Sequence, residues 1–105
     1  MNQERSKACV GWVVVMNGDL QGQDFRLVEG QNVIGNSAEC DIVLSGPYIS
    51  SRHAVICCDG RAFMLKDLGS TNGTFLEGSP CTESEIKDSA RLRLGRTDLK
   101  FRSLH

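Results

Sequence analysis

Hydrophobic and polar residues alternate over short stretches along most of the chain, and turn-forming residues separate these stretches. A period of two residues is typical of β-strands that bury one face. This pattern predicts strands at residues 10–16, 24–28, 32–34, 42–44, 54–58, 61–66, 74–76, 90–94 and 99–103. No window of ten residues carries a helical period, and residues 83–88 are expected to form at most one helical turn.

Turn signals close most of the predicted strands. Asn17-Gly18-Asp19 follows the first strand, and Asp59-Gly60 between residues 58 and 61 is the strongest hairpin signal in the chain. Many short strands at close spacing predict an all-β sandwich of roughly nine to eleven strands. With 105 residues there is material for one domain, which we assign to residues 9–105 after a flexible tail at 1–8.

Composition supports a folded domain and limits its partners. Hydrophobic residues make up 40% of the chain and charged residues 24%, and the net charge is −1. A near-neutral chain argues against binding the nucleic-acid backbone, which requires a strong positive field. No apolar run approaches the roughly 20 residues of a membrane helix, so we expect no membrane insertion. Residues 1–12 carry charges without the apolar stretch of a secretory signal, which favours a cytoplasmic location.

Cations are concentrated near the C-terminal end of the sequence. Arg91, Arg93, Arg96, Lys100 and Arg102 lie within residues 89–105, where Asp98 is the only acid. Four of these cations alternate with apolar residues, which predicts that they lie on the solvent face of strands. A patch for nucleic acid or another anionic partner is the alternative. Trp12 lies among valines and is expected to belong to the core.

The five cysteines are an odd number, so at least one lacks an intrachain partner. In the absence of a secretory signal they are expected to be reduced. The chain has no C-x-x-C motif and only two histidines, so we expect no metal and no cofactor. Small buried apolar residues are the favoured interpretation of the cysteines, and redox sensing by an exposed thiol is the alternative.

Three polar segments interrupt the strands, at residues 34–41, 49–53 and 67–74. Loops of a sandwich cluster at its two ends, and binding residues concentrate on such loops. Serine, threonine and asparagine side chains provide donors in these segments, and glycines allow backbone N–H groups to approach a ligand. This chemistry is typical of a surface that recognises a polar or anionic ligand.

These segments resemble the forkhead-associated (FHA) domain family, in its bacterial form. The resemblance rests on I-G-x-S followed by C-D-I-V-L, then S-x-x-H-A, then D-L-G-S-T-N-G-T-F, in this order and spacing. It covers about residues 10–103 and implies an eleven-stranded β-sandwich whose loops bind phosphothreonine peptides of partner proteins. The residues that it places at the peptide site are Asn36, Ser50, Ser51, Arg52, Thr71 and Asn72. The residues that it assigns to loop structure are Gly35, His53, Asp67, Ser70 and Gly73.

The resemblance implies a role for each peptide-site residue. Ser50 corresponds to the hydroxyl that bonds phosphate, and Ser51 stands where many relatives have a cation or asparagine. Thr71 resembles a residue that contacts phosphate or lines the pocket for the threonine methyl group. Asn72 resembles the residue that bonds the ligand backbone. Tyr48 is the aromatic residue best placed to line a peptide surface.

Asn36 departs from the family pattern, which has arginine after the first glycine as the principal cationic phosphate ligand. A hydrogen bond to a charged group contributes roughly 1.5–3 kcal/mol, so its loss weakens binding by roughly 10- to 100-fold. Arg52 is the nearest remaining cation in sequence, and Arg61 or Arg96 would contribute only if the fold brings them close. Two hypotheses follow: a signalling adaptor that still binds phosphothreonine, or a phosphate-independent interaction module with a degenerate pocket.

An enzymatic function is not favoured. The chain lacks a G-x-S-x-G motif, and Ser51 with His53 does not supply the base, orienting group and oxyanion pocket of a hydrolase. Gly69-Ser70-Thr71-Asn72-Gly73 lacks the G-K-[ST] ending of a nucleotide-binding loop and precedes a predicted strand instead of a helix.

Overall fold

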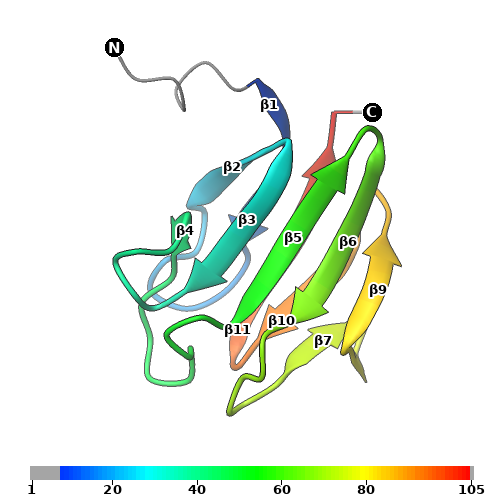
Figure 1. Cartoon of the computed structure of the whole chain (residues 1–105). Helices are drawn as coiled ribbons and strands as arrows, with labels where there is room; N and C mark the ends of the chain where they lie inside the picture. Colours follow the sequence, from blue (N-terminus) through cyan, green and yellow to red (C-terminus); the bar gives the residue numbers. More distant parts are fainter. Residues whose placement is uncertain (1–7, 105) are drawn as a thin grey trace.

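A computed structural model describes residues 8–104, in which eleven β-strands form two sheets (Figure 1). The strands are β1 Cys9–Val15, β2 Asp24–Val28, β3 Gly30–Gly35, β4 Ile42–Val43, β5 Ala54–Asp59, β6 Ala62–Asp67, β7 Thr74–Leu76, β8 Ser79–Pro80, β9 Glu83–Ile86, β10 Arg91–Leu94 and β11 Thr97–Ser103. The prediction of an all-β sandwich is confirmed. The expected tail lies outside the described residues except for Ala8, so the proposed domain boundaries stay a prediction.

The two sheets differ in size and connectivity. The order is β2-β1-β11-β10-β7-β8 in the six-stranded sheet and β4-β3-β5-β6-β9 in the five-stranded sheet. β3 and β4 run parallel, and the other described pairs are antiparallel. Within residues 8–104 no helix is long and apolar enough to span a membrane.

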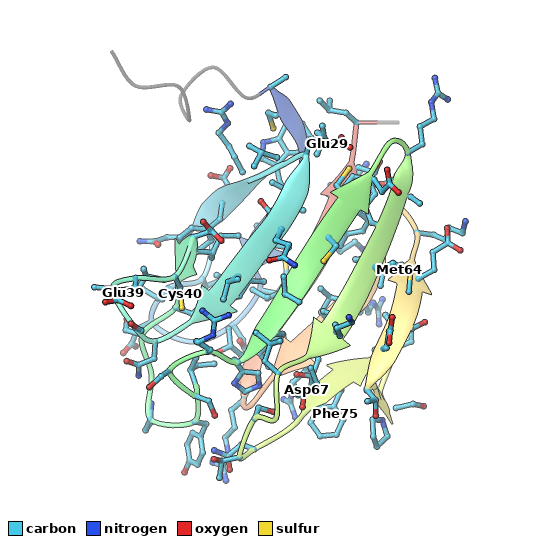
Figure 2. All side chains as sticks on the ribbon, in the orientation of Figure 1. Glu29, Glu39, Cys40, Met64, Asp67 and Phe75 are labelled. Carbon is cyan, nitrogen blue, oxygen red and sulfur yellow. The ribbon has the colours of Figure 1, made fainter. Side chains whose placement is uncertain are left out.

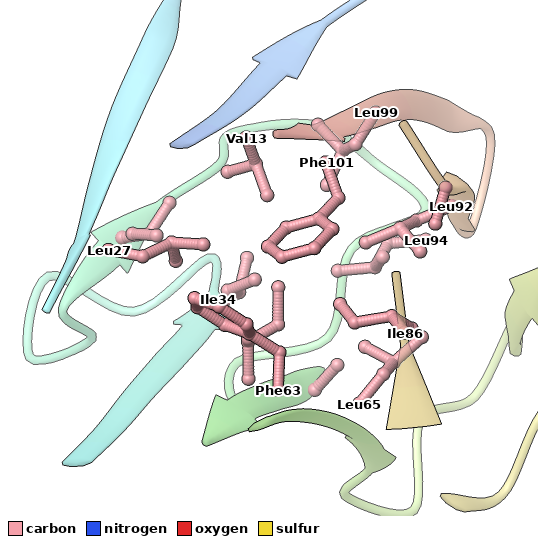
Figure 3. Packing of buried hydrophobic residues seen from close by; sticks show 14 of the residues in the cluster. Val13, Leu27, Ile34, Phe63, Leu65, Ile86, Leu92, Leu94, Leu99 and Phe101 are labelled. Atoms are coloured by element: carbon pink, nitrogen blue, oxygen red, sulfur yellow. The ribbon is translucent and has the colours of Figure 1, made fainter. Parts of the chain in front are cut away.

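The core lies between the sheets and is built from the alternate residues of each strand that face inward (Figure 3). Phe63 of β6 and Phe101 of β11 meet edge to face, with ring centroids 4.8 Å apart. Because β6 and β11 belong to different sheets, this aromatic pair joins the two layers directly. Edge-to-face pairs contribute about 0.5–1.5 kcal/mol beyond the burial of their area.

The prediction of a helical turn at residues 83–88 is wrong, because Glu83–Ile86 is strand β9. β9 pairs with β6, which places Ile86 opposite Phe63 and buries the Ile86 side chain. A free edge on β6 offers backbone hydrogen bonds and an apolar partner, and these tertiary contacts outweigh the local sequence preference. The short strand β8 was not predicted, since two residues carry no readable period.

Both sharp hairpins turn at slightly different residues from those predicted. Asp59 pairs with Ala62, so Gly60 and Arg61 form the β5–β6 turn. Leu94 pairs with Thr97, so the β10–β11 turn contains only Gly95 and Arg96. A glycine opens each turn with a positive φ, +65° and +61° respectively, which other residues adopt only with strain.

Trp12 is half-buried on the outer face of the six-stranded sheet, which corrects the prediction that it belongs to the core. It pairs across the strands with Arg26 on one side and Arg102 on the other. The inward positions of β1 belong to Val13 and Val15, which are buried. Because alternate residues of a strand face opposite sides, these two valines direct Trp12 outward.

The cysteines are less buried than predicted. Only Cys58 lies in the core, and Cys9, Cys40, Cys57 and Cys81 are half-buried. All five lie among the described residues and are unpaired. Burial and the neighbouring Glu29 carboxylate raise the pKa of Cys58 to about 11, so this thiol is protonated at neutral pH.

Replacing Phe101 with alanine is expected to lower the free energy of unfolding by about 3–5 kcal/mol, because it removes buried area and opens a cavity between the sheets. Urea denaturation monitored by Trp12 fluorescence measures the change. Met16→Ala is the control, since Met16 is 49% exposed and its truncation should change stability by less than about 0.5 kcal/mol. Equal losses for the two variants would contradict the assignment of Phe101 as the central contact.

Candidate functional site

Three loops meet at the end of the sandwich opposite the β5–β6 turn (Figure 1). The first loop joins β3 to β4, the second joins β4 to β5, and the third joins β6 to β7. These loops contain the three polar segments of the sequence. The structure therefore brings the predicted site residues to one end of the molecule.

Backbone hydrogen bonds join the first loop to the second. The N–H of Asn36 donates to the Ser50 carbonyl (3.0 Å), and the N–H of Ser37 donates to the Ser51 carbonyl (3.2 Å). Gly35 is buried at this contact, and a Cβ atom there would overlap the Ser51 carbonyl. The close approach of the two loops therefore requires glycine at this position.

His53 joins the second loop to the third. Its ring is fully buried, and Nδ1 accepts the N–H of Ser50 at 3.1 Å. Nε2 lies 2.8 Å from the Gly73 carbonyl. Because Nδ1 accepts and Nε2 faces an acceptor, these contacts assign the neutral tautomer with its proton on Nε2. The imidazole thus holds the backbones of two loops at a set separation.

Asp67 organises the third loop from the end of β6 (Figure 2). Its Oδ1 accepts hydrogen bonds from the hydroxyls of Ser70 (2.6 Å) and Thr74 (2.7 Å). Its Oδ2 accepts from the N–H groups of Gly69 (2.9 Å) and Ser70 (3.2 Å). Burial raises the pKa of Asp67, but these four hydrogen bonds outweigh it and hold the pKa below the ordinary 3.8.

Ser50 and Thr71 connect the second and third loops at their exposed surface. The N–H of Thr71 donates to Ser50 Oγ at 3.1 Å. Ser50 Oγ is an acceptor in this contact, so its own hydrogen remains available to a ligand. The amide nitrogen of Asn72 donates to the Tyr48 carbonyl at 3.4 Å, which leaves a second N–H and the oxygen of this amide without a described partner.

The remaining candidate residues differ in whether their side chains form hydrogen bonds within the protein. Asn36 directs its amide nitrogen to the carbonyls of Gly46 (3.4 Å) and Ile49 (3.5 Å), so its side chain lies along the second loop. In contrast, the side chains of Ser51, Arg52 and Thr71 are exposed and form no hydrogen bond with other described residues.

The β10–β11 turn is a fourth element of this end, and sequence reasoning missed it. The N–H of Gly95 donates to the Gly73 carbonyl at 3.0 Å, and a Cβ atom on Gly95 would overlap the Tyr48 carbonyl. The neighbouring Arg96 places its guanidinium 4.2 Å from the centre of the Tyr48 ring. No motif surrounds Gly95, so only the long-range contact identifies its role.

The structure also decides between the two distant arginines. Arg96 lies beside the second loop on Tyr48, whereas Arg61 lies in the β5–β6 turn at the opposite end of the sandwich. Of the three arginines considered as phosphate contacts, Arg52 and Arg96 therefore lie at the loop end and Arg61 does not. In residues 8–104, no three histidine, cysteine, aspartate or glutamate side chains are arranged to hold a metal ion.

Comparisons with known proteins identify relatives of this chain. The chain matches the family model of the FHA domain over residues 32–95. It is 34% identical over 90 residues to FHA domain-containing protein FhaA of Mycobacterium tuberculosis, a match that covers 86% of this chain and 17% of FhaA. It is 34% identical over 92 residues to FHA domain-containing protein FhaB of the same species, covering 87% of this chain and 59% of FhaB.

A solved structure gives the same result for the fold. That structure comes from a structural and functional study of phosphothreonine-dependent FHA domain interactions. Its TM-score is 0.83 at 32% identity, and the match covers 91% of this chain and 97% of the other. The chain spans less than two thirds of the length of FhaA and of FhaB.

Asp67→Asn is expected to lower the free energy of unfolding at neutral pH by about 1–3 kcal/mol, because an amide cannot accept all four hydrogen bonds. The folded-state pKa of Asp67 lies below its unfolded value, so the carboxylate stabilises the fold fully above the unfolded pKa. This contribution is lost as the pH falls toward the folded pKa. The difference between variant and wild type should therefore narrow below about pH 4.

Urea denaturation across this pH range measures the effect. Asp59→Asn is the control, since Asp59 is exposed at the end of β5 and its replacement should change stability by less than about 0.5 kcal/mol. A difference between Asp67→Asn and wild type that stays constant from neutral to acidic pH would contradict the assigned role of the carboxylate.

Proposed function

Because this chain belongs to the FHA domain family, we propose that it is a signalling adaptor whose loop end binds a phosphothreonine segment of a partner protein. FHA domains are interaction modules without catalytic activity. The observation that carries the proposal is the Ser50–Thr71 contact, a 3.1 Å hydrogen bond that joins two loops beside the exposed side chains of Ser51 and Thr71. Hydroxyls and amides grouped in this way suit a phosphate bound by hydrogen bonds.

In this proposal each exposed group has a distinct part. The hydroxyls of Ser50, Ser51 and Thr71 donate to phosphate oxygens. Arg52 supplies positive charge, and the uncommitted amide atoms of Asn72 bond the backbone of the ligand. His53 and Asp67 do not touch the ligand and instead hold the loops in position.

Asn36 sets the expected strength of binding. A neutral amide cannot provide the charge or the two parallel hydrogen bonds with which arginine holds a phosphate. Arg96, which lies over the Tyr48 ring, adds positive charge at the loop end but does not occupy the position of Asn36. We therefore expect affinity roughly 10- to 100-fold below that of a site with the arginine.

A second candidate function is a phosphate-independent protein-interaction module that retains the scaffold and uses it for an unmodified partner. One observation favours it: Asn36 turns its amide toward the Gly46 and Ile49 carbonyls of the second loop. A side chain engaged with its own loop is less available to a ligand. Both candidates take a protein partner and involve neither nucleic acid nor membrane insertion.

We also propose a cytoplasmic location. The chain has an odd number of cysteines, and Cys58 lies in the core as a protonated thiol. Reduced cysteines are typical of a reducing compartment.

The test is a titration of a phosphothreonine peptide library, with an unphosphorylated version of each peptide, against wild type, Ser50→Ala and Asn36→Arg. Wild type is expected to prefer the phosphorylated peptides. Ser50→Ala should lose this preference because it removes the hydroxyl between the loops, and Asn36→Arg should bind roughly 10- to 100-fold more tightly. Fluorescence anisotropy measures all three.

Two matched controls accompany this titration. Ser45→Ala removes an exposed hydroxyl elsewhere on the second loop, and Gln31→Arg adds the same charge on β3 away from the site. Neither should alter phosphopeptide binding. If wild type shows no preference for phosphate and Asn36→Arg gains one, the proposed recognition of phosphothreonine fails.

A further inference from the structure

A recessed surface lies on the outer face of the six-stranded sheet. It is a pocket of about 570 Å³, within the range of ordinary ligand sites. Its charged and apolar walls come from Met16, Phe75, Arg91, Arg93, Asp98 and Lys100. The three cations of this wall and its one acid all come from the adjacent strands β10 and β11.

Asp98, the acid of the pocket, already accepts hydrogen bonds from other side chains of the protein. Oδ1 of Asp98 accepts from Nε of Arg93 at 2.8 Å, and Oδ2 accepts from the Asn17 amide at 3.1 Å. One carboxylate therefore neutralises one arginine. Its remaining oxygen is satisfied by a neutral group, so Asp98 does not balance the other two cations.

Arg91 and Lys100 lie directly opposite each other in the antiparallel register of β10 and β11. Like charges at directly opposite positions destabilise a sheet. Neither side chain forms an ion pair within the part of the chain that the structure describes. Glu77 approaches Arg91, but it accepts the backbone N–H of that residue at 2.9 Å. Two facing cations thus remain for an external anion.

Apolar surface adjoins these cations. Phe75 is half-buried in the wall of the pocket, opposite Arg93 in the sheet, and Met16 is 49% exposed. The Phe75 ring also lies against Gly73 of the third loop, since a Cβ atom there would be 3.0 Å from the ring. Figure 2 shows Phe75 at the loop end of the sandwich, near Asp67. The pocket therefore adjoins the third loop at Gly73.

We propose that this pocket binds an acidic peptide segment of a protein partner, with its carboxylates at Arg91 and Lys100 and an apolar side chain against Phe75 and Met16. A short acidic peptide matches the two unbalanced cations and the apolar wall together. A nucleic acid would require a wider positive field than three cations provide on a chain of net charge −1. The proposal does not depend on recognition of phosphothreonine.

The probe is a short fluorescein-labelled peptide of glutamates around one phenylalanine, without threonine or serine. Saturable binding to wild type is expected, with an affinity that falls as salt is added because the contact is exposed. Arg91→Glu/Lys100→Glu should weaken binding by at least roughly tenfold, because it replaces two attractions with repulsions. Fluorescence anisotropy measures the change, and thermal unfolding checks that the variant is folded.

Two controls separate the pocket from overall charge and from the loop site. Arg61→Glu/Lys66→Glu makes the same change in net charge at the β5–β6 turn and on β6, and it should bind the peptide as wild type does. Ser50→Ala should also bind normally, whether or not it loses phosphopeptide binding. This second control distinguishes failure of the pocket proposal from failure of the proposed function.

Amide chemical shifts of unaltered wild-type protein locate the peptide without any substitution. Shifts at Leu92 and Leu99, which line the pocket between the cations, support the proposal. Absence of saturable binding, shifts confined to the three loops, or an equal loss in both charge-reversal variants would overturn it. Tighter binding of a labelled single-stranded oligonucleotide at this face would also overturn it, in favour of a nucleic-acid surface.

Discussion

The buried imidazole of His53 is the contact on which the arrangement of the three loops depends. It accepts a hydrogen bond from the second loop and donates one to the third, and its ring is closed to water. Loss of either partner would leave a buried polar atom unsatisfied, which costs more than the bond itself contributes. Loops that are distant in sequence are therefore joined into one unit at this end.

Two close backbone approaches complete this unit. Gly35 lets the first loop touch the Ser51 carbonyl, and Gly95 lets the β10–β11 turn touch the Tyr48 carbonyl. The Gly73 carbonyl accepts from both Gly95 and His53, so the turn and the imidazole share one anchor. The arrangement of this end thus depends on these glycines and His53, together with the hydrogen bonds that Asp67 accepts in the third loop.

Two surfaces of different chemistry adjoin at Phe75. The loop end offers hydroxyls and amides, with Arg52 and Arg96 as its arginines and the neutral Asn36 turned toward the second loop. The outer face of the six-stranded sheet holds cations whose charge only Asp98 offsets at the pocket. A partner that binds both surfaces would bind more tightly than one that contacts the loops alone, because the first contact raises the effective concentration of the second.

The sequence by itself determined the fold class, most strand positions and the three polar loops, because alternation, turn residues and motifs are local signals. It missed β9, which the free edge of β6 converts from an expected helical turn into a strand. It also misplaced Trp12, since only the packing of Val13 and Val15 shows which face of β1 is inward. Only the tertiary structure brought Gly95 and Arg96 to the loop end and set Arg91 opposite Lys100. These contacts join residues distant in the chain, and strand register, which no local pattern encodes, decides which charges face each other.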